Sequence, residues 1–356
     1  MAIDISPILE DVNSLSGADK ANINDAVFER YRQDASFAQH HEILYGVRAN
    51  ANIPVISAKP NYGFLKVSAG DCSTNSCDLD ATSSNKKWNP VDYDCRVTIC
   101  KQTLDADFRK FWDMNCKDFD NIEDAYVQFL IELAMTNLNA SQWRIGYFDD
   151  SEDDDAAYAG IDGLFKQMAA LAPVGSPNRF VIAENAEATI AEQMDLADDT
   201  AYNALKDMYD YASIAQSHIL DEPNVHFDIT PALAANYLSY LRDNKEVNCC
   251  FSATDGITGS RYSRENLNYM GIPLRIRSEW EGVIKWQAAK EEADNYNDPH
   301  RIVLTYKENK PVGICDDASF RSFDLWYERK DKELIMDIGT SMDAKIVIGS
   351  DFVLAM

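Results

Sequence analysis

Two short runs late in the chain decide the fold: Tyr269-Met-Gly-Ile-Pro-Leu-Arg-Ile276 and Pro299-His-Arg-Ile-Val-Leu-Thr-Tyr306. Both are rich in β-branched and aromatic residues and are bounded by turn formers, so each is predicted to be a central strand of a sheet. Residues 278–296 between them carry large apolar residues and then turn polar, which favours a loop or short helix over a third strand. The core of a sheet is therefore predicted to lie late in the chain.

The 356-residue chain is strongly acidic, with 33 Lys and Arg against 59 Asp and Glu and a formal net charge of -26. Such a surface repels nucleic acids and anionic membranes, because binding their phosphates requires clustered Lys and Arg. The composition therefore argues against a nucleic-acid reader or a membrane-binding protein. A hydrophobic content of 46% and this length allow two or three domains with a large core.

The N-terminus lacks the basic start and apolar segment of a signal peptide, and no apolar run approaches the about 18 residues that span a bilayer. These features predict a chain that is made and folded in the cytoplasm. Its eight cysteines are then expected to be free thiols, although a particle released from the cell could oxidise them.

The N-terminal part predicts extended structure. Residues 1–52 are mostly polar and indicate an arm with one helix, which must lie against its own body or a neighbouring subunit. The next segment predicts a long β-hairpin with strands at Gly63–Ala69 and Val91–Lys101 and an irregular tip. Alternate residues of the second strand are apolar, as expected when one face is covered. Few helices lie nearby in the sequence, so a neighbouring molecule is one candidate for the cover.

A helix is predicted from Ile122 to about Leu138, because Asp120 or Asn121 can cap it and acidic residues occupy its first turn. Its apolar residues cover more than one face, which is typical of a helix buried on several sides. This pattern suits a spine between a sheet and the long hairpin or another subunit.

The clearest domain boundary is Asp149–Asp155, where six of seven residues are carboxylates that cannot all be buried. A linker or exposed loop is the simpler interpretation. A hard-cation site is the alternative, since carboxylate oxygens suit calcium, but the spacing of an EF-hand is absent. The run therefore does not favour a metal.

The remaining chain mixes strands and helices, and the architecture it predicts is α+β. A mixed body runs from about 156 to 318, and the last strands return to the long helix. The predicted elements are a strand near Phe180–Ala183, a helix around 202–212, a strand at Val225–Thr230, a helix opened by Thr230-Pro231, a polar loop at 252–268, and strands at Phe323–Tyr327, Leu334–Ile338 and Lys345–Ala355.

Enzyme signatures are missing from the sequence. It contains no Gly-x-Ser-x-Gly elbow, no His-Glu-x-x-His, no phosphate loop and no dinucleotide-binding Gly-x-Gly-x-x-Gly. His40 and His41 lie in the arm, and His218, His226 and His300 are isolated. A structural role is expected for His300, because only its position after a proline singles it out. The sequence thus predicts no catalytic, cofactor-binding or metal-binding residue, and a structural protein is favoured over an enzyme.

Four cysteines superficially repeat a zinc pattern of two paired ligands: Cys72, Cys77, Cys95 and Cys100. Four intervening residues are marginal for zinc, and in a strand Cys95 and Cys100 point to opposite faces. Free thiols are favoured, a Cys72–Cys77 disulfide comes next, and zinc last. A cytoplasmic thiol enzyme using Cys72 or Cys95 is the contrasting functional class, but no histidine lies close to either in the sequence.

Several short motifs follow one another in the order of these elements: Gly160-Ile-Asp-Gly-Leu-Phe, Val225-His-Phe-Asp-Ile-Thr-Pro, Tyr269-Met-Gly-Ile-Pro-Leu, Asp298-Pro-His-Arg-Ile-Val-Leu-Thr with Pro311-Val-Gly, and Phe323-Asp-Leu-Trp-Tyr, which leads to β-strands up to the last residue, Met356. This succession resembles the major capsid proteins of tailed bacteriophages, the Hong Kong ninety-seven type capsid fold, in forms like those of phages of gut Bacteroides. The likeness covers about 120–356, and the rest follows only the order of elements.

The resemblance implies an N-terminal arm (1–52), an extended loop (53–104), a peripheral domain with a spine helix (105–150 and 319–356) and an axial domain (151–318). The loop at 252–268 would face a symmetry axis. The chain would self-assemble into hexamers and pentamers of an icosahedral virion shell that encloses double-stranded DNA without reading its sequence.

The resemblance also implies partners. A portal and possible decoration proteins are expected, with assembly in the cytoplasm of a bacterial host. Because no long scaffolding region precedes the arm, we expect either a separate scaffolding protein or a processed N-terminus. An encapsulin-like cellular compartment is the alternative within the same fold.

Overall fold

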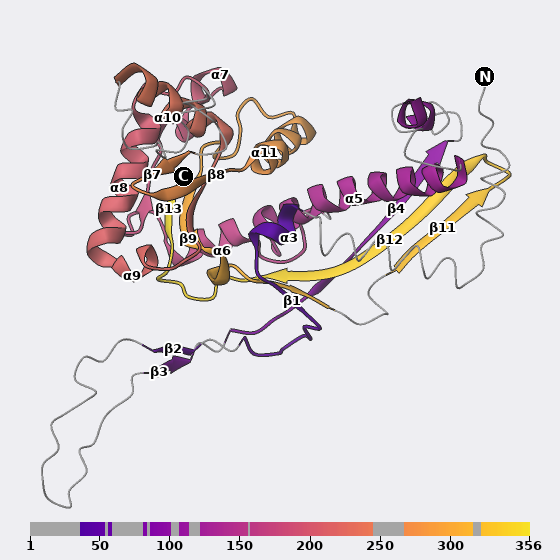
Figure 1. The fold of residues 1–356 in the computed structure, drawn as a ribbon, viewed down its shortest axis with the longest axis horizontal. Coiled ribbons are helices and arrows are strands. Elements are labelled where there is room, and N and C mark those ends of the chain that lie inside the picture. Colours follow the sequence, from indigo (N-terminus) through magenta and orange to yellow (C-terminus); the bar gives the residue numbers. More distant parts are fainter. Residues whose placement is uncertain are drawn as a thin grey trace, which may run out of the picture.

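The computed structural model describes residues 36–53, 56–58, 81–83, 86–100, 107–113, 122–155, 157–244, 267–315 and 322–356. Figure 1 shows a rounded body that holds the C-terminus and, beside it, an elongated lobe in which helix α5 (Ile122–Phe148) lies along long strands. Each part is built on its own sheet. No helix among the described residues is long and apolar enough to cross a bilayer.

The body is built on a six-stranded sheet. Its strands, in spatial order, are β5 (Arg179–Phe180), β13 (Val353–Ala355), β9 (Ile302–Tyr306), β6 (Val225–Ile229), β8 (Ile272–Ile276) and β7 (Asn268–Tyr269). Every residue of β9 is buried, because both faces of the sheet are covered. Ile302 and Leu304 pack on one side with helices α8 (Thr200–Ala215) and α10 (Pro231–Asn244), and Val303 joins the core on the other side.

The two runs that open the sequence analysis are therefore strands of one sheet, as predicted, with β6 inserted between them. The segment that joins them is helix α11 (Ser278–Glu291), which buries Trp280, Val283 and Ile284. The predicted helices at 202–212 and after Thr230-Pro231, and the strand at Val225–Thr230, are also present.

The elongated lobe is built on a five-stranded sheet around β12 (Glu333–Ala344). One edge of β12 pairs with β4 (Val91–Cys100), and the other pairs first with β11 (Ser322–Glu328) and then with β10 (Val312–Ile314), which in turn pairs with β1 (Ile43–Tyr45). The helix α5 (Ile122–Phe148) runs along this sheet (Figure 1). Alternate residues of β12 pack against it in one core, namely Leu334, Met336 and Ile338.

Helix α5 is longer than the predicted 122–138. Beyond Leu138, Asn139 accepts a hydrogen bond from the backbone N–H of Phe37 in α3 (Ser36–His40) at 3.3 Å. The following turns bury Trp143, Ile145 and Tyr147. The helix therefore continues because its last turns pack in the core.

The strand predicted at Val91–Lys101 is β4, and its predicted hairpin pairing with Gly63–Ala69 stays a prediction. Among the described residues β4 pairs with β12, more than two hundred residues later in the sequence, and α5 of the same chain covers its apolar face. The described residues contain a smaller hairpin pairing, between β2 (Ile56–Ala58) and β3 (Ala81–Ser83). Gly63–Ala69 lies outside the described residues.

The chain end also differs from the prediction of one strand over Lys345–Ala355. Residues 345–352 form an irregular segment, in which the N–H of Ile348 donates to Asn309 at 2.7 Å, and only β13 is extended. Strand β13 crosses into the body sheet between β5 and β9. The strand predicted at Phe180–Ala183 is the shorter β5. Residues 1–35 and 245–266 lie outside the described residues.

Gly163, just before helix α6 (Leu164–Leu171), marks a close contact between body and lobe. A Cβ there would lie 2.6 Å from the carbonyl carbon of Tyr147 and 2.7 Å from its oxygen, whereas a Cβ on Gly282 in α11 meets nothing within 4 Å. We expect Gly163→Ala to lower the free energy of unfolding by about 1–3 kcal/mol. The control Gly282→Ala should be neutral or raise it by up to about 1 kcal/mol. Urea unfolding of both variants tests this, and equal effects would contradict it.

Candidate functional site: a buried charged cluster between the two sheets

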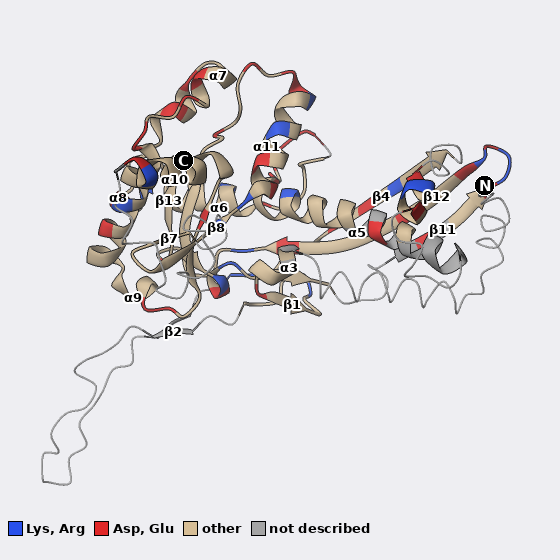
Figure 2. Ribbon diagram, turned by 45° about the horizontal axis from the view of Figure 1, so that its top comes forward, with Lys and Arg blue, Asp and Glu red and all other residues tan. Residues whose placement is uncertain are grey.

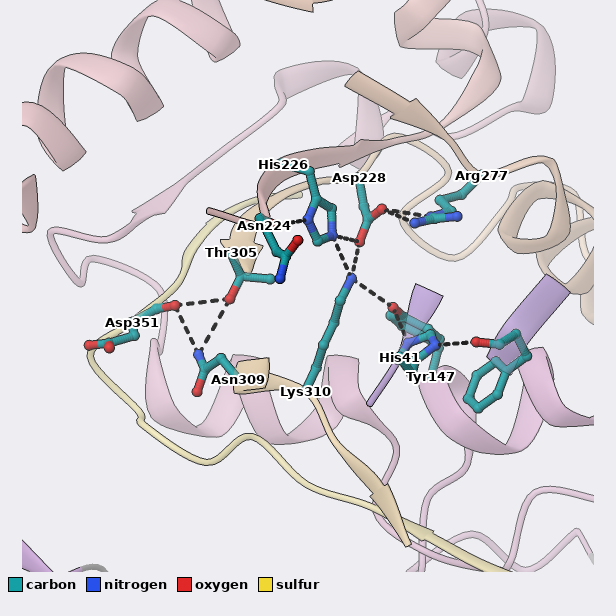
Figure 3. A network of polar contacts seen from close by, with 11 residues as sticks. His41, Tyr147, Asn224, His226, Asp228, Arg277, Thr305, Asn309, Lys310 and Asp351 are labelled. Atoms are coloured by element: carbon teal, nitrogen blue, oxygen red, sulfur yellow. Dashed lines mark hydrogen bonds and ion pairs between the residues drawn. The ribbon is translucent and has the colours of Figure 1, made fainter. Parts of the chain in front are cut away.

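Six ionisable side chains with almost no exposure to solvent meet where the two sheets approach each other (Figure 3). We call them the junction cluster: His41, Tyr147, His226, Asp228, Arg277 and Lys310. His41 follows α3 and Tyr147 lies in α5, whereas the others come from β6, the start of α11 and the link to β10. The cluster thus connects the elongated lobe to the body.

Asp228 is the centre of the junction cluster. Its position in β6 points the carboxylate away from the α8–α10 core, and there it accepts a hydrogen bond from Arg277 Nε at 2.6 Å and pairs with Lys310 Nζ. Burial alone would raise the pKa of Asp228, but Arg277 and Lys310 hold it well below its usual range. Asp228 is therefore a buried carboxylate neutralised by two cations.

Lys310 has an acceptor for each of its three ammonium protons. These are the carboxylate of Asp228, Nε2 of His226 at 3.0 Å and the hydroxyl oxygen of Tyr147 at 3.5 Å. Burial lowers the pKa of Lys310 to about 8, although the nearby Asp228 carboxylate opposes the shift. At neutral pH the side chain is a fully satisfied ammonium ion.

The hydrogen bonds assign the protons of both histidines. Nδ1 of His226 lies 2.7 Å from the carbonyl of Asn224, and Nδ1 of His41 lies 2.9 Å from the carbonyl of Phe37. A carbonyl only accepts, so each Nδ1 carries the proton and each Nε2 is an acceptor. In His41, Nε2 accepts from the Tyr147 hydroxyl (2.9 Å). In His226, Nε2 accepts from Lys310, so its 3.2 Å approach to the Asp228 carboxylate is a contact without a shared proton. Both imidazoles are neutral, and burial lowers the pKa of each.

Aromatic rings complete the junction on the side of α5. The ring of Phe37 stacks on His41 at 4.2 Å between centroids, and Trp143 stacks on Tyr147 at 5.5 Å. The guanidinium of Arg277 lies over the Trp143 ring at 5.3 Å. The segment from α3 is thereby fixed to α5 at the point where α5 meets the body.

A lysine of lowered pKa beside a carboxylate and a histidine is also found in catalytic sites. Here, however, Lys310, Asp228 and His226 are 2% exposed or less, and Lys310 donates to both of the others. The arrangement supports a structural role, namely fixing the body against the lobe.

The acidic run Asp149–Asp155 is mostly a surface turn, as predicted. Asp149 is the exception: it is buried, pairs with Arg144 Nη1 at 2.7 Å and accepts from the Tyr93 hydroxyl at 3.0 Å. Burial raises its pKa to about 6 because Arg144 and Tyr93 only partly oppose it. Lys166 and Lys290 pair with the outer carboxylates Asp150 and Asp155. No three His, Cys, Asp or Glu side chains in the described part of the chain are grouped to hold a metal.

The other residues considered from the sequence lie apart from the cluster. His300 is buried, with Nε2 2.7 Å from the Gln193 carbonyl, and Arg301 packs its guanidinium 4.3 Å from the Phe165 ring centroid. Cys95 and Cys100 are exposed free thiols, which face Ile338 and Glu333 respectively across the ladder. Cys72 and Cys77 lie outside the described residues.

Sequence reasoning missed the junction cluster, because its members are far apart in the chain. Two signals were present: Asp228 lies with His226 in a strand whose other residues are apolar, and Lys310 ends a polar stretch, 307–310, between two apolar runs. A charge inside a strand that must be buried on both faces requires a partner. The sequence does not show which residue supplies it.

Comparison with known proteins gives a fold but no sequence relative. No family model matches the chain, and no curated protein sequence matches it. Among solved structures, a chain of the satellite phage P4 procapsid including size determination (Sid) protein matches with a TM-score of 0.53 and 11% identity, over 93% of this chain and 98% of that one.

A chain of Gordonia phage Cozz matches with a TM-score of 0.48 and 10% identity, over 90% of this chain and 85% of that one. A chain of the bacteriophage PhiM1 mature capsid matches with a TM-score of 0.43 and 11% identity, over 90% of this chain and 86% of that one. Identities this low show the fold alone, and the match above 0.5 carries the conclusion. The protein has the α+β fold of a phage capsid chain, in agreement with the Hong Kong ninety-seven type resemblance.

Replacing Lys310 tests whether the junction cluster stabilises the fold. In Lys310→Met, Asp228 keeps one cation, and Tyr147 and His226 lose a donor, so we expect a loss of about 3–5 kcal/mol in the free energy of unfolding. The exposed Lys206→Met should change it by less than about 0.5 kcal/mol. Asp228→Asn combined with Lys310→Met should cost less than the sum of the single changes. Additive effects in urea unfolding would contradict direct coupling.

Stability should fall in mild acid. The folded-state pKa values of His41, His226, His40 and His300 are all lowered, so the unfolded chain takes up protons that the folded chain refuses. The stability from these neutral rings is complete above about pH 6.5 and is lost below it, by up to about 1.4 kcal/mol per pH unit for each ring. Asp149, with a raised pKa of about 6, acts in the opposite sense between pH 6 and its unfolded value of 3.8.

Thermal unfolding between pH 7.5 and 5.5 measures this dependence. We expect a falling melting temperature and a shallower decline for His41→Gln, whose amide can still bond Tyr147 but does not titrate. A profile that is flat, or identical in the variant, would show that His41 does not contribute.

Proposed function

We propose that this chain is a major capsid protein of a tailed bacteriophage, whose copies assemble into hexamers and pentamers of an icosahedral shell around double-stranded DNA. The observation that carries the proposal is the shared fold with the P4 procapsid chain over nearly the full length of both. A shell subunit needs self-complementary surfaces rather than one reactive site. The buried junction cluster meets the further need for a fixed angle between body and lobe.

The charge of the chain suits a container. Asp and Glu are spread over the body, including around α7 (Ile190–Gln193), and Lys and Arg gather at the turn between β11 and β12 (Figure 2). With a net charge of -26, the protein would repel packaged DNA rather than adhere to it. DNA would be enclosed without sequence-specific binding.

Within this proposal, 1–52 is the N-terminal arm, 53–104 the extended loop, 105–150 with 319–356 the peripheral domain and 151–318 the axial domain. Two strand pairings support a change to this proposed division. β13 pairs within the body sheet, which favours counting 353–355 with the axial domain, and β10 pairs within the lobe sheet, which favours counting 312–314 with the peripheral domain. Strand β4, assigned to the extended loop, pairs with β12 of the peripheral domain.

Scaffolding, portal and decoration proteins are proposed as separate partners, with assembly in a bacterial host cytoplasm. An encapsulin-like compartment shell is the second candidate, because it would use the same fold. Neighbouring genes for portal, terminase and protease would decide for a phage. A thiol enzyme has no support from the described cysteines, since Cys95 and Cys100 stand on a strand with Ile338 and Glu333 as partners.

Assembly of the purified chain tests the proposal. Light scattering and electron microscopy, with and without a scaffolding protein, should reveal hexamers, pentamers or shells. Particles from producing cells should contain double-stranded DNA if the shell belongs to a phage and protein cargo if it is a cellular compartment. A strict monomer at high concentration, also with scaffold present, would contradict both.

A further inference from the structure

Strand β4 has an edge that no described strand occupies. Its other edge forms an antiparallel ladder with β12, from Cys100 opposite Glu333 to Val91 opposite Met342. The strand is 10 residues long and contains no proline, so the backbone groups that point away from β12 can all take part in a second ladder. A regular edge of this length accepts a further strand unless something blocks it.

The side chains of β4 also leave apolar surface at this edge. Val91, Tyr93, Val97 and Ile99 pack against the core beneath α5 but stay half-buried, and Cys95 in the same row is exposed. The cover that α5 provides therefore ends before the edge of the sheet. An added strand with apolar residues on the same face would cover the rest of this apolar surface.

We infer that β4 pairs antiparallel with β4 of a second copy, about a two-fold axis between the two Cys95 residues. Around such an axis each residue faces the one equally far on the other side of Cys95, and both stay on the same face of the joined sheet. The facing pairs, each formed twice, are Asp94 with Arg96, Tyr93 with Val97, Val91 with Ile99, and Asp92 with Thr98.

Charge selects this register over its neighbours. If the axis lay at Asp94 or at Arg96, that residue would face the same residue of the second copy. If it lay at Tyr93, Asp92 would face Asp94, again two like charges. If it lay at Val97, Asp94 would no longer face Arg96. Only the Cys95 axis sets opposite charges face to face while keeping like charges apart, and facing like charges destabilise a sheet.

Arg96 can bind Asp337 of its own chain and Asp94 of the second copy at the same time. It already donates to Asp337 of its own chain through Nε at 2.7 Å and Nη2 at 2.6 Å, while its guanidinium lies 5.4 Å from the ring centroid of Trp326. The guanidinium has five N–H donors, so donors remain for Asp94 of the second copy. The result is a continuous sheet through β11, β12 and β4 of both copies.

Cys95 reports on this contact. Facing residues of an antiparallel pair have Cα atoms about 4.5–5.5 Å apart, within the range that a disulfide bridges. Mild oxidation of the purified chain should therefore link two Cys95 thiols, two electrons and two protons passing to the added oxidant such as diamide. Peptide mass spectrometry identifies the linked residues. The dimer concerns two copies in solution, so it does not depend on the proposed shell.

Four variants make the experiment decisive. Cys95→Ser should abolish the linked dimer, and Cys100→Ser should leave it unchanged. Asp94→Arg, which sets Arg opposite Arg96, should reduce linking at least about fivefold, as a repulsion of about 1 kcal/mol requires. Asp92→Arg makes the same charge change on the same face but opposite Thr98, and should link as the parent does.

Three results would overturn the inference: linkage through Cys100, Cys95 linkage that Asp94→Arg leaves unchanged, or no Cys95 linkage at any concentration or in assembled particles. A Cys95-linked dimer without shells would contradict the proposed function alone. Shells without that link would contradict the β4 contact alone.

Discussion

A carboxylate cut off from water must be neutralised where it lies, and Asp228 imposes this constraint on the whole molecule. Its strand is buried on both faces, so its partners come from other elements: Arg277 from the start of α11 and Lys310 from the link to β10. Lys310 then fixes the proton positions of Tyr147 and the tautomer of His41. One buried charge thus determines how the N-terminal segment, α5 and both sheets meet.

This constraint also bears on function. In the shell that we propose, each subunit would contact many neighbours. Shear between body and lobe would break the contact between Lys310 and the Tyr147 hydroxyl and leave buried polar groups without partners, which disfavours other arrangements. We infer that stiffness at the junction, rather than chemistry, is what the cluster provides.

Local patterns in the sequence predicted the strands around Leu274 and Leu304, the helix after Thr230 and the β11–β12 hairpin, since these depend on residues close together in the chain. Pairings between distant segments were not predictable: β4 with β12, β13 with β9, and the junction cluster. The end of α5 was predicted too early, because its last turns are held by contacts with distant residues, such as that of Asn139 with Phe37 in α3. The charge of Asp228 in a buried strand indicated a buried ion pair, but the sequence did not show which residue would be its partner.

We infer that the junction cluster fixes the body against the elongated lobe. Pulsed electron spin resonance measures this directly, with labels at Ile214 on the body and Lys330 at the far end of the lobe, in a chain whose native cysteines are replaced. We expect a narrow distance distribution for the parent and a broad or shifted one when Asp228→Asn and Lys310→Met are combined in a chain that remains folded. Equally narrow distributions at the same distance would contradict it.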